Sequence, residues 1–231
     1  MTYTNSPLVV YTRLSPNHSG QRTHTIDRIT PHCVVGQCTA ESLGALFADP
    51  SRQGSSNYGI DKNGRVGLYV EEKNRSWCSS SNENDQRAVT IECASDTAEP
   101  YTMNAAVYET LIRLCTDICK RNGKKKLLWF GDKDKTLNYI PAADEMVITV
   151  HRWFSNRSCP GTWLYSRLGD LAAKVTAALA DTVPAKTETT TEKKKYYRVQ
   201  IGAFTAKANA DAMLKKIKSA GFTDAFIKYG E

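Results

Sequence analysis

Residues 88–95 read AVTIECAS, and this stretch gives the clearest indication of the fold. Val89 and Ile91 belong to an apolar run of strand length, which predicts a buried β-strand over residues 88–93. Glu92 places a carboxylate near the end of this otherwise apolar strand. Similar apolar runs predict further strands at residues 32–35, 65–70, 126–129 and 146–150.

Helical spacing appears between these predicted strands. One helix is predicted to start near Asn104 and to stop at Gly123, a suitable C-terminal glycine, and a second follows later in the chain. Asp61-Lys-Asn-Gly64 predicts a hairpin turn. Strands interleaved with helices indicate an α/β domain. The apolar positions of the two helices are Val107, Leu111, Leu114, Cys115 and Ile118, then Leu164, Leu168, Leu171, Val175 and Leu179.

A linker divides the 231 residues into two parts. Residues 181–195, DTVPAKTETTTEKKK, hold almost nothing that could be buried. We therefore expect a domain at 1–180, a linker at 181–195 and a module at 196–231. The module reads as a β-α-β unit: strand YYRVQIGAF, a helix ending at Gly221, and strand AFIKY. Two strands bury little, so the module should pair with a second copy or lean on the first domain.

The net charge of +7 is concentrated in the tail, where residues 186–231 hold ten Lys or Arg and five Asp or Glu. This favours an anionic partner: nucleic acid, an acidic membrane surface or an anionic cell wall. The tail has no motif that reads a nucleic-acid groove, so we do not expect nucleic acid. No run approaches the roughly twenty apolar residues that span a bilayer, and the N-terminus does not resemble a secretory signal. We therefore expect no membrane partner. We also expect that the protein is made and kept in a cytoplasm.

Histidine and cysteine supply the candidate chemistry. The seven cysteines are odd in number, irregularly spaced and without a CxxC pair, which argues against a disulfide framework or a four-cysteine zinc site. His32 and His151 adjoin predicted strands, and Cys159 follows in HRWFSNRSCPG. Two imidazoles and a thiolate suit Zn²⁺ and leave a fourth position open. The alternative is that both histidines are hydrogen-bonded and partly buried. Glu92 is either a solvated residue or a base held over a site.

His32, the GIDKNGRV turn, Glu92 in VTIEC and the segment HRWFSNRSCPG occur in one order along the chain. Together they resemble the zinc-dependent N-acetylmuramoyl-L-alanine amidases of type 2, which include phage endolysins and are related to peptidoglycan recognition proteins. The resemblance covers roughly residues 8–180. It implies a mixed central sheet flanked by helices, with zinc bound by His32, His151 and Cys159. It also implies that Glu92 is the catalytic acid and base.

Arg157 stands where this family usually has lysine. Because arginine stays protonated, it can stabilise an oxyanion but cannot transfer a proton. A family tyrosine aligns one or two residues before Tyr58, so Tyr58 is expected in the core. Trp77 and Asn82 are candidates for lining the substrate groove, although Trp77 is equally expected as a packing residue.

The tail resembles about half of a SPOR-type repeat, which implies peptidoglycan binding, with dimerisation as one way to complete the half-domain. The whole chain is then expected to be a peptidoglycan hydrolase that cleaves the amide bond between N-acetylmuramic acid and L-alanine. We expect a phage or prophage endolysin that stays in the host cytoplasm until its release onto the cell wall. The alternatives are a bacterial autolysin with the same chemistry and a non-catalytic recognition protein, which Cys159 argues against.

Overall fold

The structure is a computed structural model that describes residues 3–180, 202–222 and 225–227. Its contacts divide the chain into two units, Met1–Pro184 and Ala185–Glu231. The predicted linker at 181–195 lies outside the described residues, so the boundaries 1–180, 181–195 and 196–231 stay a prediction.

The first unit is built on a seven-stranded sheet in the order β1-β5-β4-β7-β3-β9-β8. Neighbouring strands are parallel except for the antiparallel pair β4 and β5. A separate antiparallel pair joins β2 to β6. The strands are β1 Val9–Thr12, β2 His18–Gln21, β3 Arg28–Cys33, β4 Tyr58–Ile60, β5 Val66–Leu68, β6 Asn74–Ser76, β7 Ala88–Cys93, β8 Lys126–Leu128 and β9 Glu145–Ile148. This mixed, mostly parallel sheet confirms the predicted α/β class.

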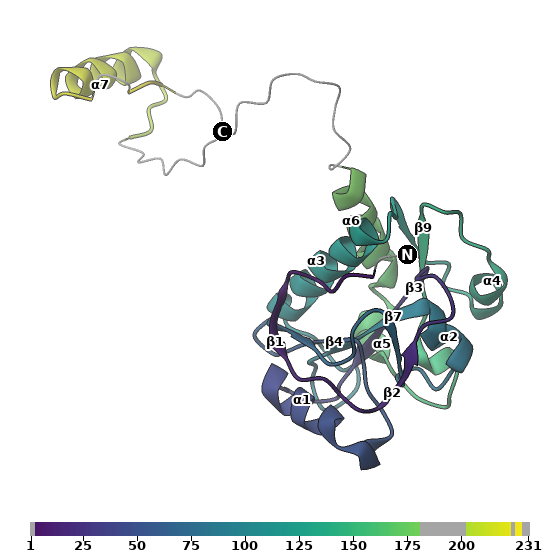
Figure 1. Ribbon diagram of the computed structural model, residues 1–231. Coiled ribbons are helices and arrows are strands. Elements are labelled where there is room, and N and C mark those ends of the chain that lie inside the picture. Colours follow the sequence, from purple (N-terminus) through teal and green to yellow (C-terminus); the bar gives the residue numbers. More distant parts are fainter. Residues whose placement is uncertain (1–2, 181–201, 223–224, 228–231) are drawn as a thin grey trace. The chain divides into compact units, whose positions relative to one another are not determined.

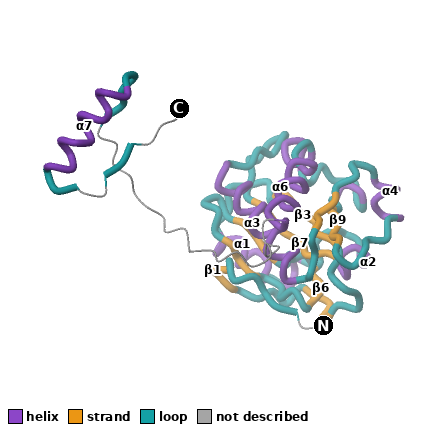
Figure 2. Tube along the Cα trace, turned by 90° about the horizontal axis from the view of Figure 1, so that it is seen from above, coloured by secondary structure: helices purple, strands orange, loops and turns teal. Residues whose placement is uncertain are grey.

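Helices cover both faces of the sheet. The long helices α3 and α6 lie side by side on one face, and α1 lies on the other (Figures 1 and 2). The helices are α1 Ala40–Ala48, α2 Asn82–Arg87, α3 Ala105–Arg121, α4 Lys133–Asn138, α5 Gly161–Tyr165, α6 Leu168–Ala180 and α7 Lys207–Ser219, with 3-10 turns η1 Pro50–Arg52 and η2 His151–Trp153. None of the helices within the described ranges is long and apolar enough to cross a membrane.

Successive side chains of β3, β7 and β9 alternate between the two faces of the sheet. Ile29, Ile91 and Ile148 belong to the main core beneath α3 and α6. Because successive side chains of a strand point to opposite faces, Thr30, Thr90 and Glu92 face away from that core. On this second face, the hydroxyls of Thr30 and Thr149 lie 2.7 Å apart in a hydrogen bond. The sheet therefore has an apolar face and, behind it, a buried polar one.

Close packing on the second face explains one glycine. A Cβ at Gly59 in β4 would lie 2.5 Å from Leu43 of α1 and 2.7 Å from the Tyr69 ring. Its neighbours Tyr58 and Ile60 point the other way into the main core. Tyr58 is fully buried, as predicted, and its hydroxyl donates to Glu72 over 2.7 Å. Glycine at 59 thus lets α1 approach the sheet closely.

Several predicted elements are confirmed. Residues 88–93 form β7, the turn at Asp61–Gly64 joins β4 to β5, and Asn104 caps α3 through its side chain. In the turn, Asp61 Oδ1 accepts hydrogen bonds from the backbone N–H groups of Asn63 and Arg65 at 2.8 and 2.9 Å. Gly64 adopts φ +77°, which glycine tolerates without strain.

Two predicted elements need correction. The strand predicted at 32–35 instead runs from Arg28 to Cys33, so His32 lies near its end rather than at its start. Arg28 and Thr30 are hydrogen-bonded inside the polar face, and their polarity concealed the strand from a search for apolar runs. The helix predicted through Leu164–Leu179 is interrupted between α5 and α6, where the Arg167 guanidinium donates to the Trp163 carbonyl over 3.0 Å.

The second unit is described as helical. Helix α7, Lys207–Ser219, confirms the predicted helix, and Gly221 follows it at φ +99°. Residues 202–204 and 225–227, the described parts of the two predicted tail strands, are irregular. The rest of those predicted strands lies outside the described residues.

Helix α6 is expected to stabilise the first unit rather than the tail, because Leu171 is fully buried in the main core. Leu171→Ala should lower the free energy of unfolding by about 2–5 kcal/mol through lost burial and a cavity. Denaturant titration followed by tryptophan fluorescence measures this unit alone, since Trp77, Trp129, Trp153 and Trp163 are the chain's four tryptophans. Leu46→Ala in α1, where the leucine is 39% exposed, is the matched control. Equal effects of the two substitutions would contradict the assignment of α6 to the core.

Candidate metal centre

Parallel pairing of β3 and β7 brings the first two candidate residues together. His32 is directly opposite Glu92 in the register of this pair. Side chains that are partners in a parallel ladder point to the same face, here the polar face of the sheet. His32 Nδ1 and Glu92 Oε1 are 3.9 Å apart, and the histidine side chain is only 1% exposed.

His151 reaches the same place from the neighbouring strand. β9 ends at Ile148, and Val150 beyond it still points into the core. His151 follows directly and begins the 3-10 turn η2. The ring centroids of His32 and His151 are 5.0 Å apart. His151 therefore follows the strand that it was predicted to end.

Cys159 returns to the site through a closed loop. The backbone N–H of Arg152 donates to the Cys159 carbonyl over 3.1 Å, and Gly161 N–H donates to Ser158 over 2.8 Å. The Arg152 guanidinium also bonds to the Ser158 carbonyl and lies 4.6 Å above the Tyr165 ring. These contacts explain the interval in HRWFSNRSCPG: the chain turns back so that the thiol faces the two imidazoles.

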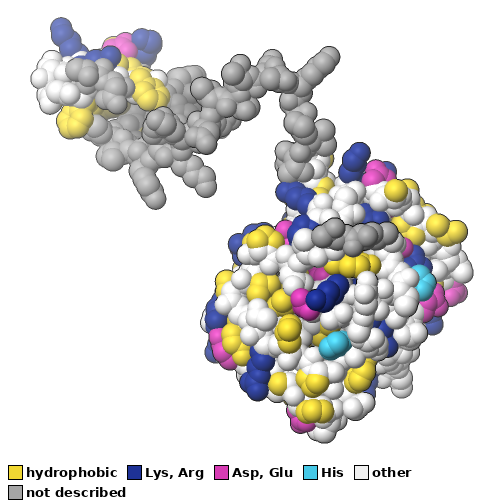
Figure 3. Space-filling view, viewed as in Figure 1, with side chains coloured by type: hydrophobic (Ala, Val, Ile, Leu, Met, Phe, Trp, Pro, Cys, Tyr) yellow, Lys and Arg dark blue, Asp and Glu magenta, His cyan; other side chains and the backbone are white. Residues whose placement is uncertain are grey.

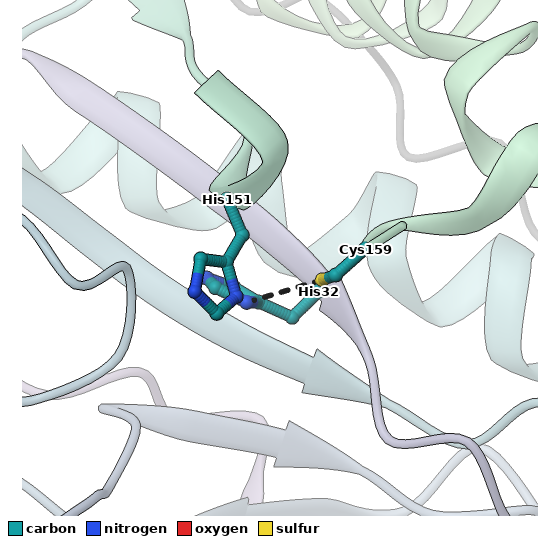
Figure 4. A group of neighbouring side chains, drawn as sticks. All are labelled: His32, His151 and Cys159. Atoms are coloured by element: carbon teal, nitrogen blue, oxygen red, sulfur yellow. Dashed lines mark hydrogen bonds between the residues drawn. The ribbon is translucent and has the colours of Figure 1, made fainter. Parts of the chain in front are cut away.

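The three donors converge on one point (Figure 4). Cys159 Sγ lies 3.3 Å from His32 Nδ1, and the ligand atoms of His32, His151 and Cys159 all lie within 4.8 Å of one another. In Figure 4 one ring nitrogen of His151 faces the His32–Cys159 pair and the other points away from it. This arrangement makes the three residues a candidate site for a metal ion.

Burial sets the electrostatics of the donors. It lowers the pKa of His32 well below the usual value, with a further contribution from His151. Burial, followed by the charge of Arg157, also lowers the pKa of His151. Both rings are therefore held neutral, the form that binds metals. Hydrogen bonding to Cys33 and then burial raise the pKa of the Cys159 thiol.

Glu92 has a partly buried carboxyl group with one buried, unsatisfied oxygen. Its side chain is 18% exposed, and Oε2 has no hydrogen-bond partner among the described residues. Burial raises the pKa of Glu92 to about 8, against smaller lowering effects from the Arg52 charge and a Cys78 hydrogen bond. An unsatisfied carboxylate in such a place is unusual for a purely structural residue.

The residues fit a zinc ion. Two neutral imidazoles and one thiol form a soft-to-borderline donor set, and three protein ligands leave a position open. His32 Nε2 is buried without a partner in the described part of the chain, so no protein acceptor competes for the ring. A bound cation would also stabilise the Cys159 thiolate, which burial otherwise disfavours.

His32, Glu92, His151 and Cys159 form one cluster. The other predicted site residues lie outside this cluster. Arg157 is exposed, and its guanidinium makes no hydrogen bond or ion pair with a described residue, although its charge acts on His151. Trp77 is half-buried, and its indole N–H donates to Ser19 over 2.7 Å. Asn82 is exposed in the first turn of α2. Their roles stay predictions.

Three neighbours of the cluster were not foreseen. Cys78 lies 3.9 Å from Glu92 Oε1 and forms an overlapping group of possible ligands with His32 and Glu92. Ser80 Oγ is 3.1 Å from His151 Nε2, and Arg52 acts on Glu92 by its charge. Cys78 and Ser80 come from one loop, in which SWCSSSN carries no apolar periodicity. Its only sequence signal is the serine-rich start of a helix cap.

The sequence matches the N-acetylmuramoyl-L-alanine amidase family over residues 22–162. The chain belongs to this family. The match spans β3, β7 and β9 and includes all four residues of the cluster. The protein is thus an N-acetylmuramoyl-L-alanine amidase, a peptidoglycan hydrolase, of a family that is typically zinc-dependent.

A second match, to the SPOR domain, covers residues 167–229. Its first part overlaps α6, which packs on α3 and β8 inside the first unit. The amidase therefore carries a C-terminal SPOR domain whose matched range begins at residue 167, directly before α6 of the first unit.

Solved structures share the amidase fold. A mutant endolysin from Bacillus subtilis aligns with a TM-score of 0.51 and 13% identity, over 71% of this chain and 97% of that chain. The Staphylococcus aureus hydrolase AmiA, solved with its ligand, gives 0.51 and 11%, over 78% and 87%. A selenomethionine derivative of AmpD gives 0.50 and 18%, over 78% and 99%. No curated protein matches the chain in sequence.

Proposed function

We propose that this amidase uses a zinc ion held by His32, His151 and Cys159, with Glu92 as the proton-transferring residue. The observation that carries the proposal is the convergence of these four side chains from β3, β7 and the two ends of one loop. When bound there, zinc would supply Lewis-acid activation of a water molecule and of the lactyl carbonyl of the substrate.

Glu92 moves the protons. A cation bound at the centre would favour the ionised form of Glu92 against the effect of burial. In that form its unsatisfied Oε2 accepts a proton as water attacks the carbonyl of the amide between N-acetylmuramic acid and L-alanine. The same carboxyl then donates that proton to the alanine nitrogen as the C–N bond breaks. Arg157 stays protonated throughout and stabilises the negative charge that develops on the carbonyl oxygen.

The alternative ligand group of His32, Cys78 and Glu92 is incompatible with this assignment. An ion bound there would take Glu92 as a ligand and leave no base. We therefore assign the ion to the group that includes His151 and Cys159. Trp77 and Asn82 are proposed to line the substrate groove; the Trp77 indole N–H is already bonded to Ser19, which favours contact through the ring face.

The C-terminal SPOR domain is proposed to bind peptidoglycan. Lysine side chains are exposed on the described part of this unit beside apolar ones (Figure 3). Phe204 and Phe222 are 41% and 62% exposed. Cations suit an anionic wall polymer, and exposed aromatic rings suit sugars or a second copy of the module. We propose residues 1–180 as the catalytic domain, 181–195 as the linker and 196–231 as the wall-binding module, with dimerisation through the module as a further proposal.

For the biological setting we propose a phage or prophage endolysin that lyses its bacterial host from the cytoplasmic side. The SPOR match favours the second candidate, a bacterial autolysin that acts at the wall of its own cell. Both act on the same amide bond, and the two differ in how the enzyme reaches the wall.

His151→Ala and Cys159→Ala should each reduce bound zinc from about one ion per chain to a small fraction, because two ligands hold zinc poorly. Elemental analysis after dialysis measures the metal content directly. Matched controls are His24→Ala and Cys38→Ala, which remove the same side chains outside the candidate group. Retention of one zinc ion by both ligand variants would contradict the assignment.

Glu92→Gln should keep the metal but lower wall cleavage by roughly a hundred- to ten-thousand-fold, because the amide cannot accept the proton. The assay is digestion of purified walls followed by counting of new L-alanine amino termini, with and without chelator. Chelated wild-type protein should release none. New reducing sugars in place of amino termini would point to a glycosidase and contradict the proposal, as would a fully active Glu92→Gln variant.

Deletion of residues 186–231 should weaken binding to intact walls by a larger factor than it lowers cleavage of a small soluble muropeptide. The reason is that the first unit retains its own core, whereas the exposed cations of the tail are lost. Sedimentation with purified walls at increasing salt measures the binding, which should decline as salt screens the charges. Equal losses in both assays would show that the tail serves the catalytic domain instead.

A further inference from the structure

Ser80 makes a hydrogen bond to the outer edge of the candidate metal centre. Its hydroxyl Oγ lies 3.1 Å from His151 Nε2, although the two residues are 71 positions apart in sequence. Ser80 is exposed and belongs to the loop between β6 and α2. Nothing in the amidase chemistry above uses this residue.

The backbone of Ser80 is in an uncommon conformation. Its φ is +64°, in the left-handed region that favours glycine. Such residues persist where the surrounding structure determines the conformation, and they are concentrated at functional sites. The conformation places the hydroxyl toward His151.

A buried carboxylate holds the loop in place. Asp85 is 1% exposed, and its side chain accepts hydrogen bonds from the backbone N–H groups of Cys78 and Ser79, at 3.0 and 3.1 Å. On the other side of Ser80, the Ser81 hydroxyl caps α2 by accepting from Asn84 N–H over 3.2 Å. The backbone on both sides of Ser80 is therefore fixed by α2, through the Asp85 side chain on one side and the Asn84 backbone N–H on the other.

The same helix ties the loop to the strands that carry the histidines. Asn84 Nδ2 donates to Ser79 Oγ at 3.2 Å and to Thr30 Oγ1 at 3.0 Å. Asn84 Oδ1 accepts from Thr149 Oγ1 at 3.0 Å. Thr30 and Thr149 each precede a histidine of the centre by two residues. The loop and the two histidines thus share one buried network.

His151 needs such an anchor more than His32 does. His32 is 1% exposed, and packing fixes its ring, whereas His151 is only half-buried. A neutral imidazole carries its proton on one nitrogen, and a partner at that nitrogen decides which one remains free for a metal. The Ser80 hydroxyl can accept from Nε2–H or donate to Nε2, and either bond restrains the rotation of the ring. Where it accepts from Nε2–H, the Nδ1 lone pair of His151 stays available for a metal.

We propose that Ser80 is a positioning residue that holds the ring orientation of His151, and that Asp85 and Asn84 keep its loop in the uncommon conformation that this contact requires. The inference rests on the proposed metal centre. It means that Ser80, an exposed residue that is not itself a zinc ligand, contributes to the zinc affinity.

The test separates backbone strain from the hydrogen bond by two opposite substitutions. Ser80→Gly removes the hydroxyl but suits a positive φ, so it should keep or raise thermal stability while weakening zinc binding about 10- to 100-fold. Ser80→Thr keeps the hydroxyl but adds a β-branch at positive φ, so it should lower stability while retaining zinc affinity within a few-fold. Competition against a chromophoric chelator measures the affinity, and the Co²⁺ spectrum of the substituted protein measures the ligand geometry.

Gln53→Gly is the matched control. Gln53 is also exposed with a positive φ, +51°, and it makes no contact with the four clustered residues. This variant should keep or raise thermal stability, as Ser80→Gly does, with unchanged zinc affinity and an unchanged Co²⁺ spectrum.

His151→Ala serves as the reference that distinguishes the two levels of the account. If it loses zinc while Ser80→Gly binds zinc as tightly as the wild type, the role of Ser80 is wrong and the metal centre stands. If His151→Ala also keeps zinc, the metal centre itself is wrong. Zinc affinity that follows thermal stability across the Gly and Thr variants would overturn the proposal, since a merely structural serine would behave in that way.

Discussion

The in-register alternation of three adjacent parallel strands, β7, β3 and β9, is the constraint on which the rest of the structure depends. Ile29, Ile91 and Ile148 are buried beneath α3 and α6, and each buried side chain of this size stabilises the fold by about 1.5–3 kcal/mol. A shift of one residue in the register of any of these strands would move its apolar side chains out of the main core. Its polar side chains would then point into that core. The burial that holds the sheet together therefore also sets His32 beside Glu92.

Burying polar groups on the second face is costly unless they are hydrogen-bonded. Thr30, Thr149 and Asn84 satisfy one another in a closed network. Within the described residues, His32 Nε2 and Glu92 Oε2 are among the few buried side-chain atoms left without a partner, and both belong to the cluster. The satisfied network makes the face rigid, and the unsatisfied Glu92 oxygen marks where it meets substrate.

Much of the catalytic fold could be predicted from the sequence, because β7, α3 and the Asp61–Gly64 turn carry strong local patterns. The sequence alone places β3 too late, because Arg28, Thr30 and Pro31 are typical of a loop. All three residues are buried, and the side chains of Arg28 and Thr30 belong to a hydrogen-bond network that forms only after folding. The same period-two pattern in RITPHC, AVTIEC and EMVITVH would have revealed the polar face. The contact between Ser80 and His151 could not be predicted from the sequence, since it joins residues 71 positions apart and depends on the conformation of a loop.

The central claim is that one ion lies between His32, His151 and Cys159 while Glu92 remains unliganded. The most direct measurement is a crystal structure of the zinc-loaded protein with anomalous data collected at the zinc edge. The account predicts one peak, about 2.0–2.1 Å from Nδ1 of both histidines and about 2.3 Å from Cys159 Sγ. A peak ligated by Cys78 and Glu92, or by Nε2 of His151, would contradict it.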